Sequence, residues 1–113
     1  MNLWLDDIRD PAQYGHVGWT WVETAEEAIE LLKTGAVERA SLDHDLTLEA
    51  SLGTPAPGET NGWTVVRWMA QNNVWPSHGV TVHSLNRDGA RRMCGPIARH
   101  YDTDPKDIWQ PVS

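Results

Sequence analysis

The stretches LWLDDIR (residues 3–9) and SLDHDL (residues 41–46) each run an apolar segment directly into two aspartates. A single aspartate after a strand is ordinary turn chemistry, because its short side chain caps the backbone. Two such segments in one small chain instead concentrate negative charge. We interpret both as buried strands whose carboxyl ends carry four acidic residues. These are Asp6, Asp7, Asp43 and Asp45.

Strand-like and helix-like segments alternate along the rest of the chain. Their hydrophobic periodicity predicts strands at residues 2–5, 19–23, 37–46 and 79–85. Helices are predicted at 25–35, 62–73 and 86–102. This alternation predicts an α/β fold with a parallel sheet and right-handed crossovers, in the strand order 2-1-3-4.

Caps and breakers mark the boundaries of these segments. Thr24, followed three residues later by Glu27, predicts the start of one helix, and Asn61 or Thr60 the start of the next. The last helix is expected to be strained or broken at Gly95-Pro96. Glycine and proline predict loops at 8–18 and 47–60, and the tail at 104–113 is predicted to be weakly structured.

The predicted strand order places the acidic residues together. Ligands of a parallel sheet bind beyond the carboxyl ends of the strands, where the strand order reverses. The first and third strands are neighbours at that point, so their aspartates converge. Clustered carboxylates repel by several kcal/mol at an intermediate dielectric and need a cation or protons. Oxygen ligands with room for water and phosphate favour Mg²⁺ or Mn²⁺.

Composition limits the setting and the partners. A chain of 113 residues predicts a single domain, 1–113, with one hydrophobic core. The lone Cys94, the absence of a long apolar run and an N-terminus unlike a signal peptide predict a reduced, cytoplasmic setting without membrane partners. A formal charge of −7 argues against long-range DNA binding. The sequence does not indicate an oligomeric state.

The acidic blocks resemble those of the response-regulator receiver domain. That resemblance implies a three-layer, flavodoxin-like fold with about four strands. It also implies that Asp6 and Asp7 bind metal, that Asp43 corresponds to the phosphoacceptor and that Ser84 corresponds to the switch hydroxyl. The chain departs from the receiver pattern because no helix is predicted after the first strand and no fifth strand ending in lysine is found.

Four blocks resemble a divergent relative, the cyclic-phosphate processing receiver-like domain. They are LWLDDIRDP (3–11), SLDHDL (41–46), TNGWTVVRWM (60–69) and VHSLNRDGARRM (82–93), in the expected order. This resemblance implies metal-assisted processing of a cyclic phosphate, either at an RNA end or in a cyclic nucleotide. The expected substrate is therefore a phosphate-containing nucleotide or RNA end.

Opening a cyclic phosphodiester requires a metal, an activated water and an acid for the leaving oxygen. We expect Asp6, Asp7 and Asp43 to hold the metal. Asp43, His83 and Asp45 are the expected catalytic residues, because His83 titrates near neutrality and Asp45 shares a strand face with Asp43 by the period of two. The substrate phosphate is expected at hydroxyl, amide and basic groups beside the acids and at the start of the last helix. These groups are Arg9, Ser84, Asn86 and Arg91.

Several of these residues have a purely structural alternative. Alternation points His44 away from Asp43, toward a structural or surface role. His83 is equally consistent with a buried histidine satisfied by the backbone. Arg91 also fits a solvated helix face, and Trp63 fits either packing or stacking on a base.

Three classes of function follow. A metal-dependent phosphoesterase is favoured, because Asp45 and His83 exceed what phosphotransfer signalling requires. The alternative is a non-catalytic receiver-like signalling module, or a phosphate- or nucleotide-binding module, that uses the same pocket. A third class, nucleic-acid enzymes with a DxD strand, matches the DHD sequence at 43–45 but lacks a partner glutamate after the first strand.

Overall fold

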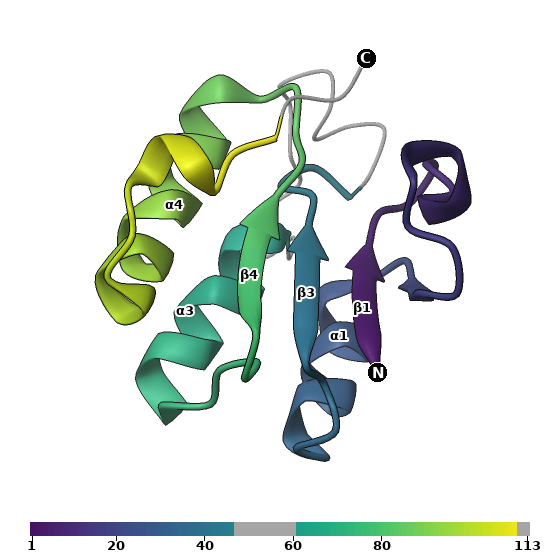
Figure 1. The fold of residues 1–113 in the computed structure, drawn as a ribbon, viewed down its shortest axis with the longest axis horizontal. Coiled ribbons are helices and arrows are strands. Elements are labelled where there is room, and N and C mark those ends of the chain that lie inside the picture. Colours follow the sequence, from purple (N-terminus) through teal and green to yellow (C-terminus); the bar gives the residue numbers. More distant parts are fainter. Residues whose placement is uncertain (47–60, 111–113) are drawn as a thin grey trace.

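The computed structural model describes residues 1–46 and 61–110. Four strands form one sheet (Figure 1): β1 (Asn2–Leu5), β2 (Thr20–Val22), β3 (Arg39–Leu42) and β4 (Gly79–Val82). They lie in the order β2-β1-β3-β4, and every pairing is parallel. The predicted α/β class and the predicted strand order are confirmed.

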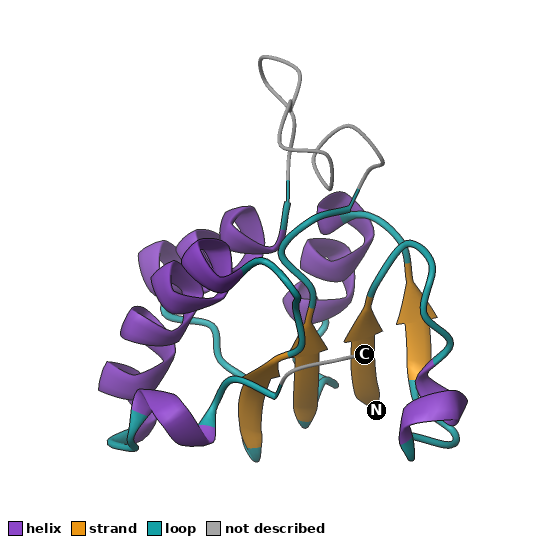
Figure 2. Cartoon of the chain, turned by 90° about the horizontal axis from the view of Figure 1, so that it is seen from above, coloured by secondary structure: helices purple, strands orange, loops and turns teal. Residues whose placement is uncertain are grey.

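Three helices cover the sheet: α1 (Ala25–Lys33), α3 (Gly62–Asn72) and α4 (Arg87–Tyr101). All three lie on the same face, and α3 packs between α1 and α4 (Figure 2). Even α4, with 15 residues, is short for a bilayer, and no helix in the described ranges has the length and apolarity to cross one.

The described residues form one helical layer, whereas a three-layer arrangement was expected. The opposite face of the sheet carries the short 3₁₀ turn η1 (Pro11–Tyr14) in place of a helix (Figure 2). Asp10 caps this turn, and Gly15 ends it with a φ of 83°. The connection between β1 and β2 is thus divided by glycine and proline into segments too short for an α-helix.

Alternation along the strands separates the two faces of the sheet. The helix-covered face carries the core residues of β1, β3 and β4, which are Leu3, Leu5, Ala40, Leu42, Val80 and Val82. Trp4 and Ser41 belong to the other face and are nevertheless buried. These strands therefore have one apolar side that packs against the helices. The acidic residues after the strands continue the opposite side.

Polar caps define the starts of the helices as predicted. Thr24 Oγ1 accepts from the amide of Glu27 at 3.1 Å, and Asn61, not Thr60, forms a capping box with Thr64. The expected break of the last helix is not present, because α4 continues through Pro96. Proline removes a single amide donor, and the burial of Ile97 beyond it holds the second half of α4 against the core.

The segment after α4 is more ordered than predicted. It forms the 3₁₀ turn η2 (Pro105–Asp107), and Trp109 then makes a parallel bridge with Val82. The amide of Val82 donates to Ile108 O at 2.9 Å, and Val82 O accepts from the amide of Gln110 at 2.7 Å. The edge of β4 is thereby covered, which explains why an apparently irregular sequence is held in place. The predicted loop at 47–60 lies outside the described residues.

Candidate functional site

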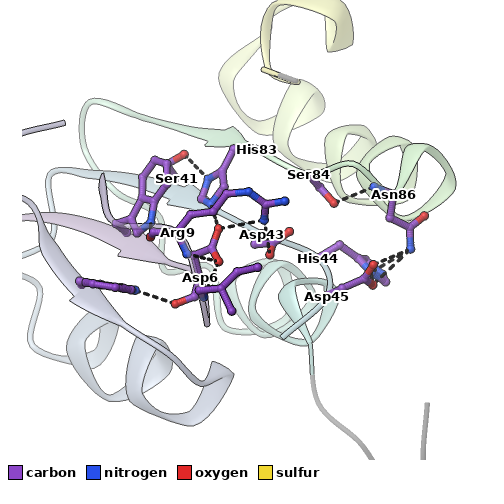
Figure 3. A network of polar contacts seen from close by, with 12 residues as sticks. Asp6, Arg9, Ser41, Asp43, His44, Asp45, His83, Ser84 and Asn86 are labelled. Carbon is purple, nitrogen blue, oxygen red and sulfur yellow. Dashed lines mark hydrogen bonds and ion pairs between the residues drawn. The ribbon is translucent and has the colours of Figure 1, made fainter. Parts of the chain in front are cut away.

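The sheet brings three polar side chains from distant parts of the sequence to one edge (Figure 3). Asp6, Asp43 and His83 each come directly after the last residue of β1, β3 and β4. The ladder continues through their backbones, since the amide of Asp43 donates to Leu5 O at 2.9 Å and that of His83 to Leu42 O at 3.0 Å. The positions of these residues are therefore set by the sheet itself.

Asp6 is fully buried and is held by four donors. Its Oδ1 accepts from the amides of Ile8 and Arg9 at 2.9 and 3.0 Å. Its Oδ2 lies 3.0 Å from His83 Nε2 and 3.4 Å from Arg9 Nη1. Burial acts to raise the pKa of this carboxyl, but the hydrogen bonds from His83 and the two amides outweigh it and lower the pKa overall. Asp6 is therefore a permanent negative charge.

Asp43 is also buried, but neighbouring donors compensate its negative charge poorly. Its Oδ2 lies 3.6 Å from Arg9 Nη1, which forms an ion pair with it. Burial, followed by repulsion from the charge on Asp6, raises the pKa of Asp43 to about 8. The charge of an ionised Asp43 therefore lacks a full counter-charge among its neighbours.

One carboxylate oxygen from each of Asp6, Asp7 and Asp43 can be chosen so that all three lie within 4.8 Å of one another. Asp7 is half-buried, and burial raises its pKa as well. An all-oxygen donor set at an edge of excess negative charge fits a hard divalent cation such as Mg²⁺ or Mn²⁺. These three residues are the same three that the sequence predicts as metal ligands.

Arg9 lies between the two buried acids. One nitrogen, Nη1, is 3.4 Å from Asp6 and 3.6 Å from Asp43, and the side chain is 17% exposed. The sequence analysis proposed Arg9 as a phosphate ligand. In the structure it pairs with both acids, and 17% of the side chain remains exposed.

His83 is engaged at both ring nitrogens. Nδ1 lies 2.7 Å from Ser41 Oγ and Nε2 lies 3.0 Å from Asp6 Oδ2. The ring stacks on Trp4 with centroids 3.8 Å apart and is 1% exposed. Burial lowers the pKa of His83 in spite of the neighbouring Asp6. His83 therefore contacts Asp6 and has no ring nitrogen directed to solvent.

Ser41 was not among the residues proposed from the sequence. It lies in the middle of β3, two positions before Asp43, on the same face of the strand. A small polar residue inside a buried apolar strand was the available signal. Its significance depends on His83, which is 42 residues away and is brought to it by the pairing of β3 with β4.

Asp45 belongs to a second polar group, formed with His44 and Asn86. His44 Nδ1 lies 2.7 Å from Asp45 Oδ1, and Asn86 Nδ2 donates to the same oxygen at 3.2 Å. Because β3 ends at Leu42, the period of two no longer applies at Asp45, which contacts His44 and Asn86 while its charge adds to the repulsion that raises the pKa of Asp43. His44 and Asp45 are both part-exposed, with side-chain accessibilities of 15% and 17%.

The remaining predicted residues have structural partners or face solvent. Asn86 Oδ1 caps α4 by accepting from the amide of Gly89 at 2.9 Å. Ser84 is buried, and its Oγ accepts from the amide of Asn86 at 3.1 Å. Arg91 is exposed and pairs with no acid in the described ranges. Trp63 packs against the core and lies under the guanidinium of Arg92.

Two glycines allow the helices to approach this edge. A Cβ on Gly62, the first residue of α3, would overlap the carbonyl oxygen of Asp43. A Cβ on Gly89, in the first turn of α4, would come within 2.5 Å of the His44 ring. Both helices therefore start directly against the chain that follows β3, and the glycines of the NGW and RDG sequences are required for this contact.

A parallel sheet in the order 2-1-3-4, with acids after the first and third strands, defines a receiver-like domain. The sequence model of the cyclic-phosphate processing Receiver domain matches residues 1–99, so the chain belongs to that family. No match was found among curated proteins. A solved structure of the RcsB response regulator of Salmonella typhimurium, determined in work on conformational dynamism for DNA interaction, is similar with a TM-score of 0.48 and 16% identity. The likeness covers 99% of this chain and 51% of that one, so the chain spans about half its length.

Proposed function

We propose that this protein is a divalent-metal-dependent phosphoesterase that opens a cyclic phosphate, at an RNA end or in a cyclic nucleotide. The observation that carries the proposal is the convergence of the Asp6, Asp7 and Asp43 carboxylates within 4.8 Å, with the pKa of Asp43 raised to about 8. Membership of the cyclic-phosphate processing family supports the choice of substrate class.

In this proposal the three aspartates hold Mg²⁺ or Mn²⁺. The chemistry supplied by the metal is neutralisation of charge on the phosphoryl oxygens and activation of the attacking water. Arg9, whose side chain is 17% exposed, binds a phosphoryl oxygen through its guanidinium, for which the planar set of donors is suited. Arg9 and the aspartates together orient an anionic substrate at an otherwise acidic edge.

The leaving oxygen requires a proton donor. His83 is a poor candidate, because both ring nitrogens are engaged and the ring is buried. The His44–Asp45 pair is better suited, since it is part-exposed and Asp45 fixes the orientation of the imidazole through Nδ1. Asp45 then orients His44, which supplies the proton, and His83 orients Asp6, which holds the metal.

A second candidate function is a phosphate- or nucleotide-binding module without turnover. The observation that favours it is the same burial of His83, which leaves no histidine nitrogen of the Asp6 cluster facing a substrate. The two candidates share the metal and the phosphate site. They differ in whether the bound cyclic phosphate is opened.

Turnover of a substrate panel separates the two. The protein is incubated with Mn²⁺ or Mg²⁺ and with 2′,3′-cyclic nucleotides, 3′,5′-cyclic nucleotides and RNA ending in a cyclic phosphate, with acetyl phosphate as a phosphodonor control. We expect metal-dependent opening of at least one cyclic phosphate, lost about 10²–10³-fold in Asp43→Asn and retained in Asp107→Asn, which alters an exposed aspartate.

The other outcomes are equally informative. Metal-dependent binding of a cyclic phosphate without opening favours the binding module, and a stable acyl phosphate on Asp43 favours a signalling receiver. Turnover that persists in the presence of a chelator would contradict the role proposed for the metal. Loss of turnover in His44→Ala, with metal affinity unchanged, is the result expected if His44 supplies the proton.

A further inference from the structure

A continuous series of hydrogen bonds leads to one of the acidic residues (Figure 3). Ser41 Oγ lies 2.7 Å from His83 Nδ1, and His83 Nε2 lies 3.0 Å from Asp6 Oδ2. All three side chains are buried, with at most 1% of any residue exposed. Ser41 is thus connected to a proposed metal ligand without touching it.

The donors available determine the direction of these hydrogen bonds. An ionised carboxylate only accepts, so the hydrogen between Asp6 and His83 belongs to Nε2. In a neutral imidazole Nδ1 then carries a lone pair, and the hydroxyl of Ser41 is the group that donates to it. Without that hydroxyl, Nδ1 would be a buried acceptor with no partner.

Packing on Trp4 removes the remaining freedom of the His83 ring. The two rings are stacked at an interplanar angle of 8°. The Trp4 indole is itself fixed, because its Nε1 donates to Arg9 O at 2.8 Å. Rotation of the imidazole would break the stack and both hydrogen bonds together, so the ring presents one nitrogen to Asp6.

We propose that Ser41 is a positioning residue for the metal site, which satisfies Nδ1 of His83 and thereby holds the ring, and through it the carboxylate of Asp6, in its orientation. This inference rests on the proposed metal-binding function of Asp6. The hydrogen bonds link a serine, a histidine and an aspartate in that order, but Ser41 is completely buried and therefore cannot act as a nucleophile. Partners of metal ligands typically change metal affinity about 10–100-fold when removed.

Thr81 provides a matched control on the neighbouring strand. It pairs directly with Ser41 across β3 and β4 and carries a hydroxyl on the same face of the sheet. Unlike Ser41, it has no hydrogen bond to His83. Ser41→Ala and Thr81→Ala therefore each remove a hydroxyl, the second together with a methyl group, and only the hydroxyl of Ser41 is connected to Asp6. Ser41→Thr tests rescue by a retained hydroxyl.

Two measurements test the proposal. Long-range ¹H–¹⁵N correlation spectra of the metal-free protein are expected to show His83 protonated at Nε2, with Nδ1 hydrogen-bonded in the wild type and without that hydrogen bond in Ser41→Ala. Calorimetric titration with Mn²⁺ is expected to show affinity reduced about 10–100-fold in Ser41→Ala. Affinity should be largely restored in Ser41→Thr and unchanged in Thr81→Ala.

A wild-type His83 protonated at Nδ1 would overturn the proposal, and this result requires no variant, so it stands even if Ser41→Ala does not fold. Equal Mn²⁺ affinity in Ser41→Ala and the wild type would also overturn it. If the wild type binds no metal, the proposed function fails along with the role of Ser41. If the wild type binds metal and Ser41→Ala binds it equally well, only the role of Ser41 fails.

Discussion

Asp43 shows how one side chain can be unfavourable for folding and necessary for the site. Its carboxyl is 3% exposed, follows the buried strand β3 and lies beside the charge on Asp6. Both effects oppose ionisation, and Arg9 offsets them only in part. In the metal-free folded protein, Asp43 therefore stays protonated at pH values at which the same carboxyl in the unfolded chain is already ionised.

The resulting dependence of stability on pH can be predicted. The pKa of Asp43 is raised from 3.8 to about 8, so its contribution to stability is complete below 3.8 and is lost as the pH rises through 8. Asp43→Asn cannot ionise and removes this loss. We expect the variant to exceed the wild type in free energy of unfolding at pH 9 by about 1–3 kcal/mol, and by less at pH 5.

Urea unfolding in the presence of a chelator, at pH 5, 7 and 9, measures this difference. Asp107→Asn, at an exposed aspartate, should follow the wild type at each pH. A difference between Asp43→Asn and the wild type that stays constant across these pH values would contradict the prediction. The same Asp43→Asn protein should bind Mn²⁺ much more weakly, so that stability and metal binding change in opposite directions.

At the level of the elements, the starts of α3 and α4 determine how closely helices approach the acidic edge. The amide of Gly62 donates to His44 O at 2.9 Å, which joins the first residue of α3 to the chain after β3. Gly89 places the first turn of α4 against the His44 ring. The first turns of α3 and α4 therefore both pack against the short segment that follows β3.

Adding a single methyl group tests this seating. We expect Gly62→Ala to lower the free energy of unfolding by about 2–3 kcal/mol, because its Cβ would overlap the backbone of Asp43, which cannot move without disturbing the sheet. Gly95→Ala, also in a helix, is the control. Its nearest neighbour would be Arg99 Nη1 at 3.6 Å, and it should gain about 0.5–1 kcal/mol.

Chemical denaturation of the two variants gives both numbers under the same conditions. Gly62→Ala is also expected to weaken Mn²⁺ binding, because the displaced backbone carries a proposed ligand. Equal stability of Gly62→Ala and Gly95→Ala would indicate that α3 is not seated on Asp43 in solution.

Considered as a whole, the molecule is a receiver-like sheet with helices on one face and with its β4 edge covered by the chain end. Residues 104–110 lie beyond the part matched by the family model, which ends at residue 99. They nevertheless pair with β4 and place Trp109 Nε1 2.9 Å from Ser84 O, directly after His83. This segment supports the site from the outer side of the sheet.

Substitutions in this segment separate packing from the hydrogen bond. Ile108→Ala empties a site that is 3% exposed and should cost about 2–4 kcal/mol of unfolding free energy. Trp109→Phe keeps an aromatic ring but removes the indole donor to Ser84 O, and should cost about 0.5–1.5 kcal/mol. Thermal unfolding compares the two. An Ile108→Ala protein as stable as the wild type would show that the segment does not cover β4 in solution.

The sequence analysis identified the strand order and the acids of the proposed metal site because both depend on local patterns. Short apolar runs that end in aspartate define where β1 and β3 stop, and a parallel sheet brings adjacent carboxyl ends together. Asp6, Asp7 and Asp43 could therefore be named before the structure. The absence of a helix after the first strand was also predicted, and only the 3₁₀ turn η1 lies there, so the single helical layer differs only from the three layers that the resemblance to receivers implied.

Other features were decided by contacts between residues far apart in the chain, which no local pattern contains. The hydrogen bond of Ser41 to His83 spans 42 residues, and that of His83 to Asp6 spans 77. The hydrogen bond of Asn86 to Asp45 spans 41 residues, and the periodicity of β3 does not predict it. Composition and periodicity determine which residues are buried, whereas the directions of buried hydrogen bonds depend on which partners the packed sheet brings within reach.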